Sequence, residues 1–86
     1  MTEKPIEDAL REMMVERLFL KLKPEEIDVN AKLMEAYGID SVQISEIVVG
    51  TETVFGITFD DDDFDPTRFD TVAHVAELVR VKLAKP

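Results

Sequence analysis

Apolar residues recur at α-helical spacing in three separate stretches of this chain, and these stretches dictate the kind of core that it can build. The predicted helices cover residues 5–20, residues 40 or 41 to 55 or 56, and residues 71–83. With 86 residues, the chain suits one domain and not two, so we expect a single domain over residues 1–86. The pattern predicts an all-α fold, a small bundle of three main helices plus a short helix, with a long loop after the first helix.

Each predicted helix has a stripe of residues that we expect to face the core. The stripes are Ile6, Leu10, Met13, Met14 and Leu18, interrupted by Arg17; Ile44, Ile47, Val48, Thr51 and Phe55; and Val72, Val75, Ala76, Val79 and Leu83. The middle stretch is rich in β-branched residues and contains Gly50, so its intrinsic helix propensity is poor. A strand over Glu46–Phe59 therefore remains an alternative. Gly56 is in the position that glycine favours just past a helix end.

The connections between the helices carry turn and capping signals. Pro24-Glu25-Glu26-Ile27 predicts a short turn inside the long connection of residues 21–39. A connection of this length needs apolar anchors in a compact domain, and the expected anchors are Ile27, Val29, Leu33 and Tyr37. Asp65 followed by Pro66 predicts the start of a short helix, and Asp70 is the expected cap of the last helix. Arg80, Lys82 and Lys85 suit the negative end of that helix.

Charge and cysteine content limit the possible functions. The net charge is −9, from 19 acidic and 10 basic residues, and such a surface repels nucleic acid and anionic membranes. It either attracts partner proteins that have basic docking patches or only keeps the protein in solution. Cysteine is absent, which excludes disulfides and thiolate metal sites and fits a reducing compartment. We see no secretory signal and no membrane-spanning run, so we expect a cytoplasmic monomer.

The segment from Tyr37 to Gln43 carries the clearest site. Gly38 permits a tight turn, and Asp40 with Gln43 three residues later forms a capping-box pattern at a helix start. This pattern places Ser41 at the first helical position, where unpaired N–H groups and the helix dipole favour a phosphodiester on its hydroxyl. Many serines at helix starts are only caps, so the residues alone leave both interpretations open.

Gly38-Ile39-Asp40-Ser41-Val42 resembles the Gly-x-Asp-Ser-Leu motif of acyl carrier proteins, and the resemblance in layout covers nearly the whole chain. It implies that Ser41 carries 4′-phosphopantetheine, which a phosphopantetheinyl transferase attaches from coenzyme A. It further implies that Asp40 helps to position the helix start and the transferase's metal and coenzyme. The chain would then be a non-catalytic carrier of acyl groups, held as thioesters, in fatty-acid, polyketide or related biosynthesis.

The resemblance also predicts a docking face on the middle helix, formed by Val42, Glu46, Val49 and Glu52. Its partners are the transferase and the acyl-loading and synthase enzymes, with basic docking patches. Val42 stands where leucine is usual in the family, and Gln43 where an acidic residue is frequent. The middle helix contains only two carboxylates, so docking should depend more on apolar contacts or on the acidic loop 60–63.

The sequence contains partial signals for three other functions. Asp61-x-Asp63-x-Asp65 is similar to the opening of a calcium-binding EF-hand loop, but Pro66 and Val72 occupy the places of its glycine and glutamate. We therefore predict no metal site. His74 is the only histidine, and nothing in the sequence places it beside Ser41 as in a hydrolase, so we predict no catalytic residue. The remaining alternative is an acidic interaction module in which Ser41 is only a helix cap.

Overall fold

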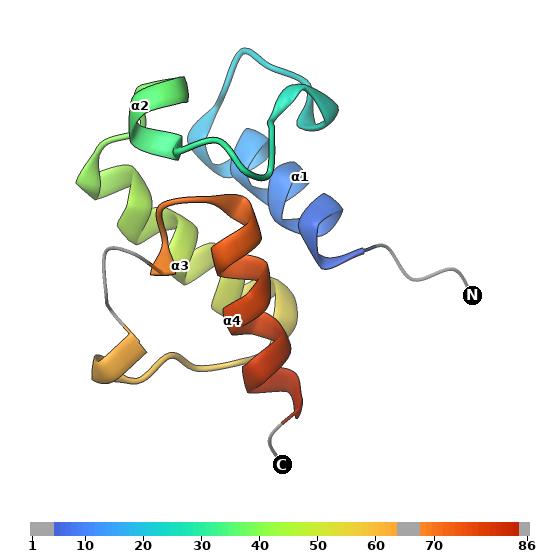
Figure 1. Cartoon of the computed structure of the whole chain (residues 1–86), viewed down its shortest axis with the longest axis vertical. Coiled ribbons are helices and arrows are strands. Elements are labelled where there is room, and N and C mark those ends of the chain that lie inside the picture. The colour runs from blue at the N-terminus through green and yellow to red at the C-terminus, as the bar shows by residue number, and fades with distance from the viewer. Residues whose placement is uncertain (1–4, 64–67, 85–86) are drawn as a thin grey trace.

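The computed structural model describes residues 5–63 and 68–84, and within these ranges every regular element is a helix (Figure 1). The α-helices are α1 (Ile6–Leu18), α2 (Leu33–Tyr37), α3 (Ser41–Phe55) and α4 (Val72–Ala84), and the 3-10 helices are η1 (Pro24–Glu26) and η2 (Asp61–Asp63). The all-α prediction is confirmed, and the alternative strand over 46–59 is wrong. No described helix has both the length and the apolar character needed to cross a membrane.

Helix α1 begins directly after Pro5, whose φ of −54° suits a helix start, and Glu7 and Asp8 lie in its first turn. It ends at Leu18, two residues before the predicted Leu20. The reason is Phe19, which adopts a left-handed conformation with φ 54° and donates its N–H to the Val15 carbonyl. The chain then turns away from the helix axis.

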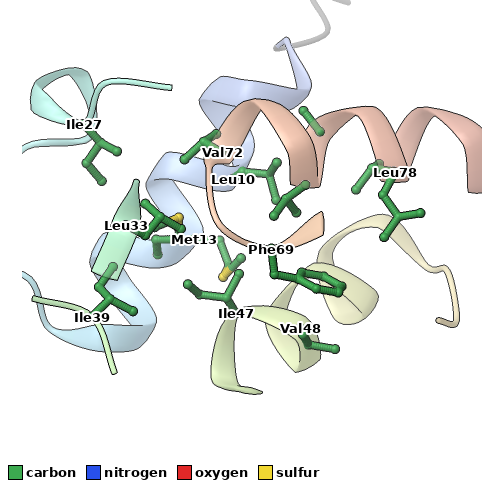
Figure 2. Close-up of a cluster of buried hydrophobic side chains, with 14 of the residues drawn as sticks. Leu10, Met13, Ile27, Leu33, Ile39, Ile47, Val48, Phe69, Val72 and Leu78 are labelled. Atoms are coloured by element: carbon green, nitrogen blue, oxygen red, sulfur yellow. The ribbon is translucent and has the colours of Figure 1, made fainter. Parts of the chain in front are cut away.

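The core lies where α1 packs against α3 and α4, and side chains from the loops complete it (Figure 2). Its buried apolar members are Leu10, Met13, Met14, Ile27, Leu33, Ile39, Ile47, Val48, Phe59, Phe69, Val72, Val75, Ala76, Leu78 and Val79. The expected loop anchors are confirmed, since Ile27 and Leu33 are buried and Val29 and Tyr37 are half-buried. Leu83, predicted to be buried, is 51% exposed, and Leu78 faces the core in its place.

The long connection is attached to the start of α4 by backbone hydrogen bonds. The Leu33 N–H donates to the Asp70 carbonyl at 2.8 Å, and the Ala73 N–H donates to the Val29 carbonyl at 2.9 Å. These bonds are made by the first residue of the short helix α2 and by Val29 before it; the sequence analysis did not predict α2. The segment that precedes Ser41 is therefore held by contacts from the far end of the chain.

The start of α4 differs from the prediction in its cap. The Thr71 hydroxyl accepts the His74 N–H at 3.1 Å, which is the capping bond that we expected from Asp70. The Asp70 carboxylate instead contacts the His74 ring Nδ1 at 2.5 Å. The predicted short helix start at Asp65 and Pro66 lies outside the described residues.

Candidate functional site

The turn into α3 is made by Gly38 and Ile39. Gly38 ends α2 with φ 66°, a left-handed conformation in which a side chain is strained, and its N–H donates to the Leu33 carbonyl. Ile39 is buried and fixes the turn to the core. Asp40 then returns to extended backbone, so the chain enters α3 from a defined direction.

Asp40 and Gln43 form the predicted capping box. The Gln43 N–H donates to the Asp40 side chain at 2.8 Å, and the Asp40 N–H donates to the Gln43 side chain at 3.0 Å. The Asp40 carbonyl also accepts the Ile44 N–H at 2.9 Å. Asp40 is therefore the N-cap residue, and these bonds hold the first turn in place without any contribution from Ser41.

Ser41 is the first residue of α3 and is exposed. Within the part of the chain that the structure describes, its hydroxyl makes no hydrogen bond, and neither do the N–H groups of Ser41 and Val42. The first turn also contains no acidic residue. The capping side chain at this helix start is that of Asp40 and not that of Ser41. A negatively charged phosphodiester fits here, beside two free donors and the positive end of the helix dipole.

The face of α3 that adjoins Ser41 is apolar and open. Val42 is 72% exposed and Val49 is 47% exposed, and their spacing of seven residues places them in one row with Glu46 between them. Ser45, one turn after Ser41, donates its hydroxyl to the Ser41 carbonyl at 3.2 Å. Its oxygen is therefore turned back toward the helix backbone, whereas the Ser41 oxygen is free.

The two carboxylates of the predicted docking face are in different situations. Glu46 lies 3.8 Å from the Arg17 Nε of α1, both side chains being partly exposed. Glu52 accepts the Phe59 N–H at 2.8 Å, so one of its oxygens holds the loop that follows α3. The structure thus brings Val42, Glu46 and Val49 together on one open face, while Glu52 has an internal contact.

Two residues near the site, Tyr37 and Arg17, make contacts that the sequence analysis did not predict. The Tyr37 hydroxyl accepts the Asp28 N–H at 2.7 Å and so ties the end of α2 to the long connection. Arg17 interrupts the apolar stripe of α1 because it lies beside α3, near Glu46 and Gly50. A polar residue inside an otherwise apolar stripe was the available signal for this second contact.

No three His, Asp or Glu side chains gather as metal ligands in residues 5–63 and 68–84. The Asp63 carboxylate, which belongs to the EF-hand-like pattern, instead receives hydrogen bonds from the Lys82 ammonium at 2.7 Å and the Asp60 N–H at 2.7 Å. The acidic loop is therefore bound to α4. From the sequence we expected Lys82 only to interact with the negative end of the α4 dipole.

The comparisons with known proteins agree with this geometry. The family model described as a phosphopantetheine attachment site matches residues 8–79. An acyl carrier protein from Wolinella succinogenes is 32% identical over 73 residues, which cover 85% of this chain and 87% of that protein. An acyl carrier protein from Nitratidesulfovibrio vulgaris is 29% identical over 58 residues, 67% of this chain and 74% of that protein.

A solved structure shares the fold. The solution NMR structure of a holo acyl carrier protein from Nitrosomonas europaea superimposes with a TM-score of 0.80 and covers 94% of this chain and 99% of that one. The sequence identity is 22%, so this comparison supports the fold alone. Together with the family match and the curated relatives, these findings show that the chain belongs to the acyl carrier family, whose prosthetic group is 4′-phosphopantetheine, as the sequence predicted.

Proposed function

We propose that this chain carries acyl groups on a 4′-phosphopantetheine arm attached to the Ser41 hydroxyl, and that it is itself not an enzyme. One observation carries the proposal. Ser41 is exposed at the start of α3 and its oxygen is free, because Asp40 supplies the cap and Ser45 is turned back to the backbone. An enzyme can reach this hydroxyl without disturbing the fold.

The attachment step is the transfer of a phosphopantetheinyl group from coenzyme A. The Ser41 oxygen forms a bond to the phosphorus that bears pantetheine, the bond from that phosphorus to the adenosine 3′,5′-bisphosphate half breaks, and the Ser41 proton passes to a base of the transferase. The free N–H groups of Ser41 and Val42 and the helix dipole stabilise the phosphodiester that results. When bound, the arm supplies the thiol for thioester formation, because the chain has no cysteine.

The docking face for the transferase and for acyl-loading and synthase enzymes is the row of Val42, Glu46 and Val49. The exposed valines support apolar contacts, and the acidic surface attracts partners with basic patches and permits fast release. Glu52 contributes less, since one of its oxygens is bound to the Phe59 N–H. The pathway that we propose is fatty-acid, polyketide or related biosynthesis.

We also propose that the carrier works as a monomer in the cytoplasm. A net charge of −9 opposes the association of two copies, and a chain without cysteine has no need of an oxidising compartment. Analytical ultracentrifugation at several protein concentrations measures the oligomeric state directly. A mass near the 9.8 kDa of one chain is the expected result.

Intact mass spectrometry tests the attachment site. The protein is incubated with coenzyme A, magnesium and a panel of broad-specificity phosphopantetheinyl transferases. The wild-type chain and Ser45→Ala should each gain one phosphopantetheinyl group, and Ser41→Ala should gain none. Ser45→Ala is the matched control, since it removes an exposed hydroxyl one turn away in the same helix. No gain by the wild-type chain with any transferase would favour the interaction module instead.

A further inference from the structure

Arg17 of α1 places a positive charge at the edge of the docking row of α3. Its Nε lies 3.8 Å from the carboxylate of Glu46, which stands between the exposed Val42 and Val49 in that row. Among the residues that the structure describes, Arg17 is the one cation paired with Glu46. The charge of Glu46 is therefore partly neutralised from within the molecule before any partner binds.

The packing at Gly50 keeps Arg17 in this position. Gly50 is buried one turn after Glu46, and a Cβ built there would lie 2.8 Å from the Arg17 Cδ. The stem of Arg17 thus lies against the backbone of α3, in space that a side chain at position 50 would fill. Glycine is unfavourable inside a helix, and here it admits the side chains of Met13 and Arg17. A stem that is already held reduces the conformational entropy that an exposed ion pair otherwise costs.

The rest of this face offers a partner little negative charge. One oxygen of Glu52 accepts the Phe59 N–H at 2.8 Å, and the first turn of α3 contains no acidic residue. The net charge of −9 attracts a basic enzyme over a long distance. At the docking row, however, that enzyme meets a surface that is mainly apolar and whose central carboxylate already has a partner.

We propose that Arg17 is a specificity-determining residue that masks Glu46 and so disfavours enzymes that dock on α3 through lysine or arginine. Such an enzyme must displace Arg17 before its own cation can pair with Glu46. An enzyme that binds the valines of the row through apolar contacts meets no such competition. Specificity commonly depends on an element that opposes the wrong partner as well as on contacts that favour the right one. This inference rests on the proposed function of Ser41 and its docking row.

Steady-state kinetics of phosphopantetheine transfer, with the full chain as substrate, tests the inference. From a panel of transferases, the one chosen is that whose KM for the wild-type chain rises most steeply with salt, because this dependence identifies docking through charges. Arg17→Gln should lower this KM about threefold at low salt, and the effect should fade at high salt. The kcat should stay unchanged, because Arg17 contacts Glu46 and Gly50 and not the reacting serine.

Three further variants separate masking from a general effect of charge. Lys21→Gln removes one positive charge from an exposed residue beyond the end of α1, and it should lower KM by less than about 1.5-fold. In a Glu46→Gln chain, Arg17→Gln should change KM no more than Lys21→Gln does, because no carboxylate remains to be masked. Arg17→Lys keeps a cation and should keep the wild-type KM. Melting temperatures are measured as well, since a purely structural role for Arg17 would change stability without lowering KM.

Several outcomes would overturn the inference. A KM for Arg17→Gln that is no lower than that of Lys21→Gln, or an equal decrease with and without Glu46, would show that Arg17 does not mask this carboxylate. A panel in which salt changes no KM would show that basic groups take no part in docking, and would overturn the inference as well. These results leave attachment at Ser41 intact, whereas a wild-type chain that no transferase modifies contradicts the proposed function itself.

Discussion

Two neighbouring residues have separate roles at the start of α3. Asp40 caps the helix, and Ser41 presents its hydroxyl. Asp40 satisfies the Gln43 N–H and orders the first turn of α3, and this leaves the Ser41 hydroxyl without a structural role. Both positions were predictable from sequence, because capping depends on residues only three apart. The hydrogen bond of the neighbouring Ser45 hydroxyl was not predictable, since a hydroxyl that bonds the carbonyl one turn back leaves no mark in the sequence.

Asp40→Ala should lower the free energy of unfolding by about 1 kcal/mol, because it leaves the first-turn N–H groups without their cap. Asp40→Asn keeps a capping oxygen and should cost only a small part of that. Urea denaturation followed by circular dichroism measures both values. Equal losses in the two variants would show that the aspartate stabilises the chain by its charge and not by the capping bond.

At the scale of elements, tertiary packing determines the secondary structure of segments whose intrinsic helix propensity is poor. Helix α3 forms in spite of its β-branched residues because Ile47, Val48 and Thr51 bury one face of it against the rest of the molecule. Helix α2 was not predictable, since its five residues are held by a bond from Leu33 to Asp70, far away in the sequence. The cap of α4 was misplaced by one residue because aspartate and threonine are both good caps.

Gly50→Ala tests the close packing of α1 on α3. Alanine favours a helix over glycine by about 1 kcal/mol, so the substitution stabilises an isolated helix. Here a Cβ would come within 2.5 Å of the Met13 sulfur and 2.8 Å of the Arg17 Cδ. Overpacking of this kind costs about 1–3 kcal/mol, so we expect a net loss of stability in urea denaturation. A more stable variant would show that the Met13 and Arg17 side chains, or α1 as a whole, shift without cost.

At the scale of the whole molecule, a charged cluster joins the acidic loop to the last helix. Lys82 lies 2.7 Å from Asp63 and 3.1 Å from Asp60. Hydrogen bonds, first from Lys82 and then from the Asp60 N–H, lower the pKa of Asp63 below its ordinary value of 3.8. Hydrogen bonds to the Asp63 carboxylate, and then to the Asp60 carboxylate, raise the pKa of Lys82 above 10.5. The sequence showed the charges but not their pairing, which joins residues about twenty positions apart.

These pKa shifts fix the sign of the pH dependence. The contribution of Asp63 to stability is complete above its unfolded pKa of about 3.8 and is lost as the pH falls through its lower folded value. Lys82 contributes below about pH 10.5, and its contribution is lost as the pH rises through its higher folded value. The cluster therefore stabilises the fold throughout the neutral range.

Asp63→Asn should lower the melting temperature at neutral pH and reduce the further loss of stability on acidification. Asp61→Asn is the matched control, because Asp61 is an exposed aspartate of the same loop and should leave both properties near wild type. Thermal denaturation from neutral pH to below pH 3.8 measures the difference. If the melting temperature of Asp63→Asn fell as steeply with decreasing pH as that of the wild type, the loss of stability in acid would be due to other carboxylates.

The most direct test is to locate the modified atom. The wild-type chain is converted with coenzyme A and a transferase, digested, and its phosphopantetheinylated peptide is fragmented in a mass spectrometer to distinguish Ser41 from Ser45. The added mass should be on Ser41 in every modified molecule. A modification on Ser45 or on any other hydroxyl would contradict the view that Asp40 and the first turn of α3 present this one oxygen for attachment.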